Sequence, residues 1–152
     1  MIKLVCVGTV KNKHLLALIN DYVERINHYH KLEVVEVKDE SITTDEKIIL
    51  DKEAKRVLEK ISSDEYVILL DLHGKSLDSI ELSKKLDNLM GHYAKITFVI
   101  GGSLGLGEEL IKRANERIKL SDLTFLHQMT RLILLEQVYR SFKIINNETY
   151  HK

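Results

Sequence analysis

The stretch K-I-T-F-V-I-G-G-S-L-G-L-G, residues 95–107, decides the fold. Residues 95–100 form an apolar, β-branched run, which predicts a buried strand. Four of the seven glycines of the chain lie in residues 101–107, directly after it. Glycine lets the backbone approach a ligand closely and adopt positive φ. A loop at the carboxyl end of a strand is where open α/β sheets bind small molecules, so residues 101–107 are the first candidate site.

Strand and helix patterns alternate along the rest of the chain. Apolar runs predict further strands at residues 2–7, 32–37, 66–72 and 118–120. Helical spacing of apolar residues predicts helices at 15–26, 46–61, 78–89, 108–117 and 127–145, with capping boxes at Thr43–Glu46 and at Asp78 with Glu81. Continuous apolar strands joined by helices predict an α/β fold, a mostly parallel sheet with helices on both faces, in one domain spanning 1–152.

The helix predicted at 127–145 has apolar residues around most of its circumference. A helix that is apolar on several sides must be covered on several sides. Because the chain is small, we expect a second copy to supply part of that cover, in a homodimer.

Composition excludes several classes of protein. The charges balance, with 23 Lys and Arg against 23 Asp and Glu, which argues against a sequence-blind nucleic-acid binder but leaves room for recognition of one structured RNA. No apolar run is long enough to span a membrane. Cys6 is the one cysteine, so no intramolecular disulfide is possible and the cytoplasm is the expected location.

The glycine loop does not match the known phosphate-binding loops. It lacks G-x-G-x-x-G, and Glu108 stands where the lysine of G-x-x-x-x-G-K belongs. Glu108 and Glu109 at the start of a helix would repel phosphate, so an uncharged or cationic ligand is favoured. A strand-to-helix turn without a ligand is the alternative. Residues 120–125, half apolar, are a candidate slot for a flat heterocycle, or a plain connecting loop.

Several charged and aromatic residues lie in the last third of the chain. His127 and Arg131 share a helix face, and the chain ends in Tyr150-His151-Lys152. Arg140 either belongs to the site or forms an ordinary ion pair with Glu136, four residues before it. The scattered histidines and the single cysteine argue against a metal site, and G-x-S-x-G is absent.

Taken in order, the motifs resemble a known family over essentially the whole chain. They are V-G-T near the N-terminus, L-D-L-x-G-K at 70–75, F-V-I-G-G-S-x-G-L, L-S-x-L-T-F-x-H-Q-M-x-R, E-Q-V-Y-R-x-F-K-I and a final Y-H-K. This set resembles the RlmH family, the pseudouridine N3-methyltransferases of the ribosomal large subunit within the SPOUT class. Leu126 stands where that family usually has Pro, so we expect a looser turn before His127.

The resemblance implies an α/β sheet with a C-terminal trefoil knot, a homodimer, and S-adenosylmethionine bound in the knot. It implies methylation of N3 of a pseudouridine, position 1915 of 23S ribosomal RNA, on assembled ribosomes. Arg140, Tyr150 and His151, with His127, are candidates to assist the reaction. A non-catalytic nucleotide-binding or ribosome-associated module is the rival interpretation. The cofactor positions implied are Leu70, Gly101, Leu120, Ser121, Asp122, Leu123, Thr124 and Phe125, with Gly102 and Gly105 shaping the loop.

Overall fold

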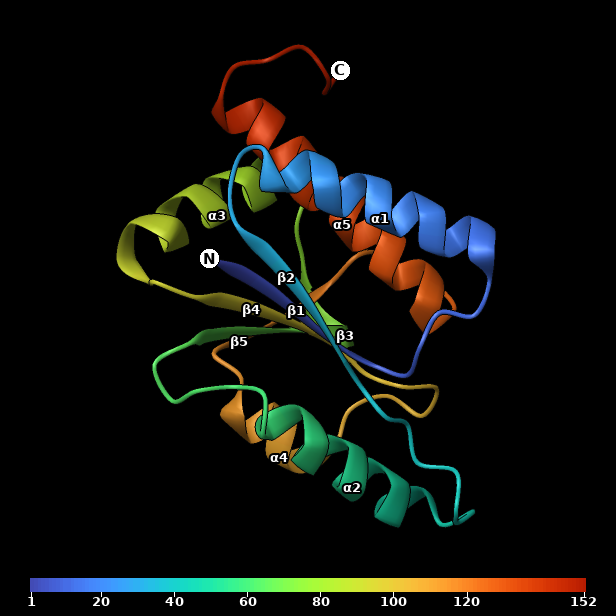
Figure 1. Ribbon diagram of the computed structural model, residues 1–152. Helices are drawn as coiled ribbons and strands as arrows, with labels where there is room; N and C mark the ends of the chain where they lie inside the picture. Colours follow the sequence, from blue (N-terminus) through green and yellow to red (C-terminus); the bar gives the residue numbers. More distant parts are fainter.

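A five-stranded, all-parallel sheet forms the centre of the computed structural model, which describes residues 1–152 (Figure 1). The α/β fold class predicted from the sequence is therefore confirmed. The strands are β1 (Ile2–Val7), β2 (Leu32–Val37), β3 (Tyr66–Ser76), β4 (Ile96–Ile100) and β5 (Glu116–Lys119). The helices are α1 (Lys13–Asn27), α2 (Glu46–Leu58), α3 (Ser79–His92), α4 (Glu108–Arg113) and α5 (His127–Ile145).

The strand order β2-β1-β4-β3-β5 places β4 at the centre of the sheet. Ile2 pairs with Ile96 and Cys6 with Ile100, so segments more than ninety residues apart lie side by side. On the other side of β4, Tyr66 pairs with the same Ile96. Because all the strands are parallel, their carboxyl ends meet at one edge, and the glycine loop leaves the sheet there.

Helices cover both faces of this sheet. In Figure 1, α1, α3 and α5 lie on one face, and α2 and α4 lie on the other. Side chains along β1 alternate between the two cores, as a strand requires. Leu4 and Cys6 belong to a cluster of 20 buried residues under α5, whereas Val5 and Val7 belong to a cluster of 9 under α2.

Helix α5 has a reason within the chain for being apolar on several sides. It packs against both α1 and α3 and lies over β4. Leu134, Leu135 and Val138 are each only 1% exposed. The chain itself therefore supplies cover that we expected from a second copy. Substituting Leu134 or Leu135 would disrupt this core and would not test dimerisation.

Local chemistry fixes the helix starts. The predicted capping box at Asp78 and Glu81 is present: the Glu81 amide donates to Asp78, and the Asp78 amide donates to Glu81. The box predicted at Thr43–Glu46 is wrong, because the N-cap lies two residues after Thr43. Asp45 is the N-cap there, and its carboxylate accepts from the amide of Ile48.

Two predicted boundaries differ because tertiary contacts decide them. Helix α4 ends at Arg113, short of the expected residue 117. Asn115 leaves the helix because its amide donates to the carbonyl of Val67 while its side chain accepts from the Val67 amide. Strand β3 continues to Ser76, past the expected residue 72.

The extension of β3 runs closely along β5. Leu70 and Lys75 both pair with Ile118, so the register between β3 and β5 shifts at residues 71–74, as in a β-bulge. A Cβ atom built on Gly74 would lie 2.6 Å from backbone atoms of Ile118. Only glycine lets the two backbones approach this closely.

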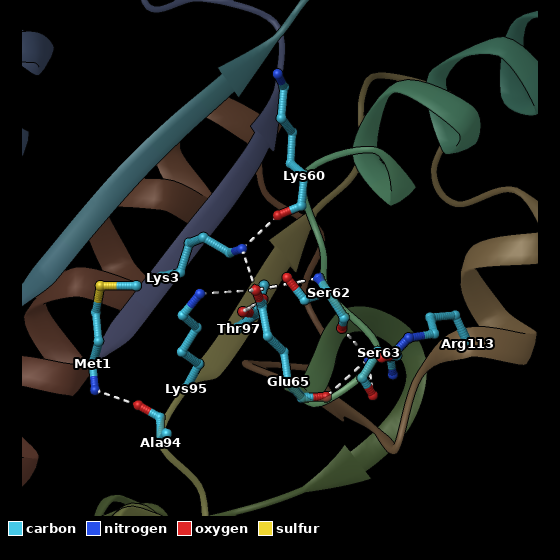
Figure 2. Close-up of polar contacts among 10 residues, drawn as sticks. All are labelled: Met1, Lys3, Lys60, Ser62, Ser63, Glu65, Ala94, Lys95, Thr97 and Arg113. Atoms are coloured by element: carbon cyan, nitrogen blue, oxygen red, sulfur yellow. Dashed lines mark hydrogen bonds and ion pairs between the residues drawn. The ribbon is translucent and has the colours of Figure 1, made fainter.

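A buried polar network joins the amino ends of β1 and β4 (Figure 2). Lys3 lies 2.7 Å from the carboxylate of Glu65, and the hydroxyl of Thr97 donates to the other carboxylate oxygen at 2.5 Å. All three residues are buried. Burial raises the pKa of Glu65, but the hydrogen bonds from Lys3, Thr97 and the Ser62 amide outweigh it and leave that pKa lowered. The network holds the 59–65 connection against the sheet.

Candidate functional site

A cavity of about 290 Å³ opens where β3, β4 and β5 end, the edge at which parallel sheets bind ligands. Its walls come from the glycine loop, residues 70–72 of β3, residues 119–121 and 123–125, and the first turn of α5. A volume of this size is at the lower end of the range for small-molecule sites. Eight of the ten predicted cofactor positions line it: Leu70, Gly101, Gly102, Leu120, Ser121, Leu123, Thr124 and Phe125.

The other two predicted positions, Gly105 and Asp122, lie outside the cavity wall. Gly105 has φ +97°, which favours glycine, and its amide donates to the carbonyl of Gly102 at 3.1 Å. Gly105 therefore shapes the turn of the glycine loop without lining the cavity. Asp122 is exposed and forms an ion pair with Lys119, and the hydrogen bond from Lys119 lowers the pKa of Asp122.

Gly101 has no room for a side chain. A Cβ atom built on it would lie 2.3 Å from the carbonyl oxygen of Gly105 and 2.8 Å from its carbonyl carbon. Both are backbone atoms, so a side chain at this position would displace the loop from the cavity.

We expect Gly101→Val to weaken ligand binding by about 100-fold or more, since the loop must open to accept the side chain. Calorimetry with S-adenosylmethionine measures this loss. Gly91→Val is the matched control, because a Cβ atom on Gly91 would meet nothing within 4 Å. Equal affinities for wild type and Gly101→Val would show that the loop does not form the binding wall.

The cavity also has lining residues that sequence reasoning did not select. Asp71 accepts a hydrogen bond from the amide of His73 and pairs with Arg117 at 3.1 Å. Asp71 could have been selected from the sequence, because it is the first charged residue after the apolar run of β3. The others are Leu72, Ile100, Ser103, Lys119 and Thr130.

Glu108 and Glu109 do not face this cavity. Both are exposed at the start of α4, on the opposite face of the sheet, and line a groove between α4 and α2. Their charge therefore does not select the ligand of the main cavity, contrary to the sequence interpretation. Asp71 and Lys119 are the charged residues in its wall.

The first turn of α5 is anchored to the loop after β1. Arg131, only 1% exposed, lies 2.8 Å from Glu36 and donates to the carbonyl of Gly8 at 3.2 Å. Gln128 donates to the carbonyl of Thr9 at 3.1 Å. These contacts hold His127 at the cavity wall.

The turn before His127 keeps the geometry that proline would impose. Leu126 has φ −54°, within the range to which the proline ring restricts the backbone. The backbone here is therefore compatible with either residue, and the looser turn stays a prediction.

The remaining candidates lie together at the other end of α5. The Arg140 guanidinium donates to Glu136 at 2.5 Å, so the predicted ion pair is present. The guanidinium carbon also lies 4.8 Å from the centre of the Tyr150 ring. The Tyr150 hydroxyl donates to Glu136 at 3.1 Å, and His151 lies 3.3 Å from Arg140. Burial, together with the hydrogen bonds to Tyr22 and Glu136, raises the pKa of Tyr150.

This second cluster is remote from the cavity of its own chain. Arg140 follows His127 by thirteen residues on one helix, which is about 20 Å at 1.5 Å per residue. The structure therefore brings Arg140, Tyr150 and His151 together but separates them from His127 and from the glycine loop.

The structure holds no group of three or more His, Cys, Asp or Glu side chains placed to bind a metal ion. None of its helices combines the length and the apolar character needed to cross a membrane. The candidate site is a cavity with mixed polar and apolar walls at the carboxyl edge of a parallel sheet, the place where α/β domains bind small molecules.

Comparisons with known proteins agree with this class. A family model described as "Predicted SPOUT methyltransferase" matches residues 1–151. The ribosomal RNA large subunit methyltransferases H of Enterococcus faecalis and Listeria monocytogenes are 45% and 46% identical to the chain, with 99% of each sequence covered. The chain therefore belongs to the SPOUT methyltransferases, and among them to the family of ribosomal RNA large subunit methyltransferase H.

A solved structure supports the fold alone. It is described as "a probable methylase family protein" from Haemophilus influenzae and superposes with a TM-score of 0.55 at 16% identity. The match covers 99% of this chain and 70% of that one.

Proposed function

We propose that this methyltransferase uses S-adenosylmethionine to methylate N3 of a pseudouridine in 23S ribosomal RNA, in the cytoplasm and on the assembled ribosome. The observation that carries the proposal is the cavity at the glycine loop, where a side chain on Gly101 would meet backbone. The names of the relatives support ribosomal RNA as the substrate.

The residues of the cavity fit the cofactor. Residues 120–125 and Leu70 supply an apolar slot for adenine, and the loop at Gly101–Gly102 supplies backbone without side chains. Asp71 in the wall offers a carboxylate to the cationic parts of the cofactor. When bound, S-adenosylmethionine supplies an electrophilic methyl group. The role of the chain is to hold this group in line with the target nitrogen.

The target N3 must lose a proton before it can accept a methyl group. Arg140 is our candidate for stabilising the resulting negative charge, since its guanidinium stays protonated. The hydrogen bond to Glu136 raises the pKa of Arg140, and this effect outweighs burial, which lowers it. Tyr150, His151 and His127 remain candidates to take the proton.

A homodimer reconciles the cavity with the remote cluster. Within one chain Arg140 lies about 20 Å along α5 from the cavity, too far to act on a bound methyl group. A second copy can bring its own Arg140, Tyr150 and His151 to that cavity. Exposed apolar side chains at the cavity rim favour such a contact, and include Leu123 at 72% and Leu126 at 62% exposure.

A trefoil knot is part of the proposal. If the chain after β4 passes through the loop after β3, we expect β3 and β5 to lie very close together. Two observations support this: Ile118 pairs with both Leu70 and Lys75, and Gly74 lies against the Ile118 backbone. The knot would lie within the one domain of residues 1–152 and would enclose the cofactor.

The charge balance makes naked RNA a poor substrate. Neutralisation of phosphates supplies most of the sequence-independent affinity for RNA, and this protein has no net positive charge. Splayed bases in a preformed loop are the better target, and the ribosome presents them.

The direct experiment measures binding and methyl transfer together. Calorimetry should show S-adenosylmethionine binding in preference to ATP, and ribosomes lacking the modification should accept a labelled methyl group while the naked transcript does not. Binding of ATP in preference, with no transfer, would support instead the non-catalytic nucleotide-binding module.

Deleting Tyr150–Lys152 should abolish methylation of ribosomes while cofactor affinity stays within about twofold, because these residues lie outside the cavity wall. The measurement is transfer to ribosomes, with calorimetry as the control for the cofactor site. Methylation by the truncated protein at the wild-type rate would exclude a role for the tail.

A further inference from the structure

Glu53 is a buried carboxylic acid that neither the fold nor the proposed reaction has yet used. It lies on α2 and is only 5% exposed. Its Oε1 accepts a hydrogen bond from the amide of Glu40 at 3.1 Å, whereas its Oε2 has no hydrogen-bond partner. A buried oxygen without a donor costs roughly 1–3 kcal/mol, so its retention needs a reason.

This unpartnered oxygen faces the glycine loop from behind. A Cβ atom built on Gly102 would lie 2.9 Å from Oε2 of Glu53 and 3.2 Å from Val7. Gly102 also lines the ligand cavity. The carboxyl group and the cavity are therefore on opposite sides of the backbone at Gly102.

The same helix supports the far end of the loop. A Cβ atom built on Gly107 would lie 2.7 Å from the carbonyl oxygen of Leu50 and 2.9 Å from Cβ of Ala54. Leu50, Glu53 and Ala54 share one face of α2, so this face contacts both ends of the 102–107 segment. A side chain at Gly102 or Gly107 would come too close to α2, so glycine at both positions lets the loop pack against this helix.

The loop contains donors that fit the free oxygen. The amides of Ser103 and Leu104 donate to no acceptor within the protein, and both residues are exposed. They follow Gly102, whose Cβ position is 2.9 Å from Oε2 of Glu53, directly in the chain. Burial raises the pKa of Glu53; Asp39 and Glu40 act in the same direction, while Arg56 and the Glu40 amide oppose it.

We propose that Glu53 is a positioning residue for the cofactor loop: as the ligand closes residues 102–105 over the cavity, a loop amide donates to Oε2 of Glu53. The inference rests on the proposed binding of S-adenosylmethionine at this cavity. Glu53 does not touch the ligand; it fixes the backbone that does.

A pair of matched variants tests the hydrogen bond. Glu53→Gln keeps one acceptor oxygen at nearly the same volume, which the side-chain amide can present to the loop by giving up the bond from the Glu40 amide. Glu53→Met fills the volume without an acceptor. We expect S-adenosylmethionine affinity within about threefold of wild type for Gln and about tenfold weaker for Met. Glu46→Gln is the control, because that carboxylate lies on the same helix but is exposed; the affinity should not change.

A double-mutant cycle tests the contact itself. Gly102→Ala should weaken binding about tenfold in the wild-type background, since the new Cβ meets the carboxylate. In a Glu53→Ala background the same change should cost less than about threefold, because the obstructing oxygen is gone. Equal costs in the two backgrounds would show that the carboxylate does not support the loop at Gly102, whereas the comparison of Glu53→Gln with Glu53→Met tests the hydrogen bond.

The outcomes separate the two proposals. If wild type does not bind S-adenosylmethionine, the proposed function fails. If wild type binds but Glu53→Met binds equally well, or Gly102→Ala costs the same in both backgrounds, the role of Glu53 is refuted. Should Glu53→Ala fail to fold, the comparison of Gln with Met decides alone.

Discussion

Subunits carrying Arg140→Ala, mixed with subunits carrying Gly101→Val, should recover methylation that neither variant has alone. Gly101→Val damages the cavity, whereas Arg140→Ala leaves it intact and removes a charge about 20 Å away along α5. If each site combines the cavity of one subunit with Arg140 of its partner, a mixed dimer contains one site without either change. Random pairing then gives about a quarter of wild-type activity.

Arg140→Ala alone should lower the rate of transfer about 10²–10³-fold while cofactor affinity stays within twofold, the pattern of a group that acts on the transition state. The measurement is labelled methyl transfer to unmodified ribosomes, after the two variants are unfolded and refolded together. A mixture of separately refolded variants is the control. No recovery in the mixed dimers would mean that each chain builds its site from its own residues.

Glu65→Leu should destabilise the protein by about 3–5 kcal/mol, because it leaves the ammonium group of Lys3 buried without its carboxylate partner. Lys3→Met combined with Glu65→Leu should recover most of that loss, since both charges of the pair in Figure 2 are then gone. Urea unfolding at neutral pH measures the free energies. A double variant as unstable as Glu65→Leu would show that packing, and not the unpaired charge, causes the loss.

The same pair predicts a dependence of stability on pH. The pKa of Glu65 in the folded protein is lowered from an ordinary value of 4.5. Its contribution to stability is therefore fully present above about pH 4.5 and is lost as the pH falls through the lower, folded-state pKa. The double variant lacks Glu65, so its unfolding free energy should fall less than that of wild type over the same acid range.

Most of the fold could be predicted from the sequence because its signals are local. The run at 96–100, the spacing of apolar residues in α1 and the capping box at Asp78 each depend on neighbours within a few positions. The end of α4 and the extension of β3 could not be predicted, since Asn115 and Gly74 are engaged by strands far away in the sequence.

The candidate site also has a part that could be predicted from the sequence and a part that could not. Eight of the cofactor positions that the family resemblance implied line one cavity. The separation of Arg140 from His127 follows from the thirteen residues between them on the predicted helix 127–145, whereas the packing of Tyr150 and His151 against Arg140 could not be predicted. Glu53 was hidden for a different reason: a charged residue in an amphipathic helix is normally placed on the solvent side, and only the packing of α2 against the glycine loop buries it.

The position of α5 in the chain has a consequence for biosynthesis. Leu134, Leu135, Val138, Tyr139 and Phe142 belong to the larger core cluster, yet they lie in α5, which follows all five strands and the other four helices in the sequence. Until they emerge, the face of the sheet that contains Leu4 and Phe98 has no cover between α1 and α3. The nascent chain therefore carries an open apolar surface until α5 has emerged, and this face of the sheet can complete its folding only then.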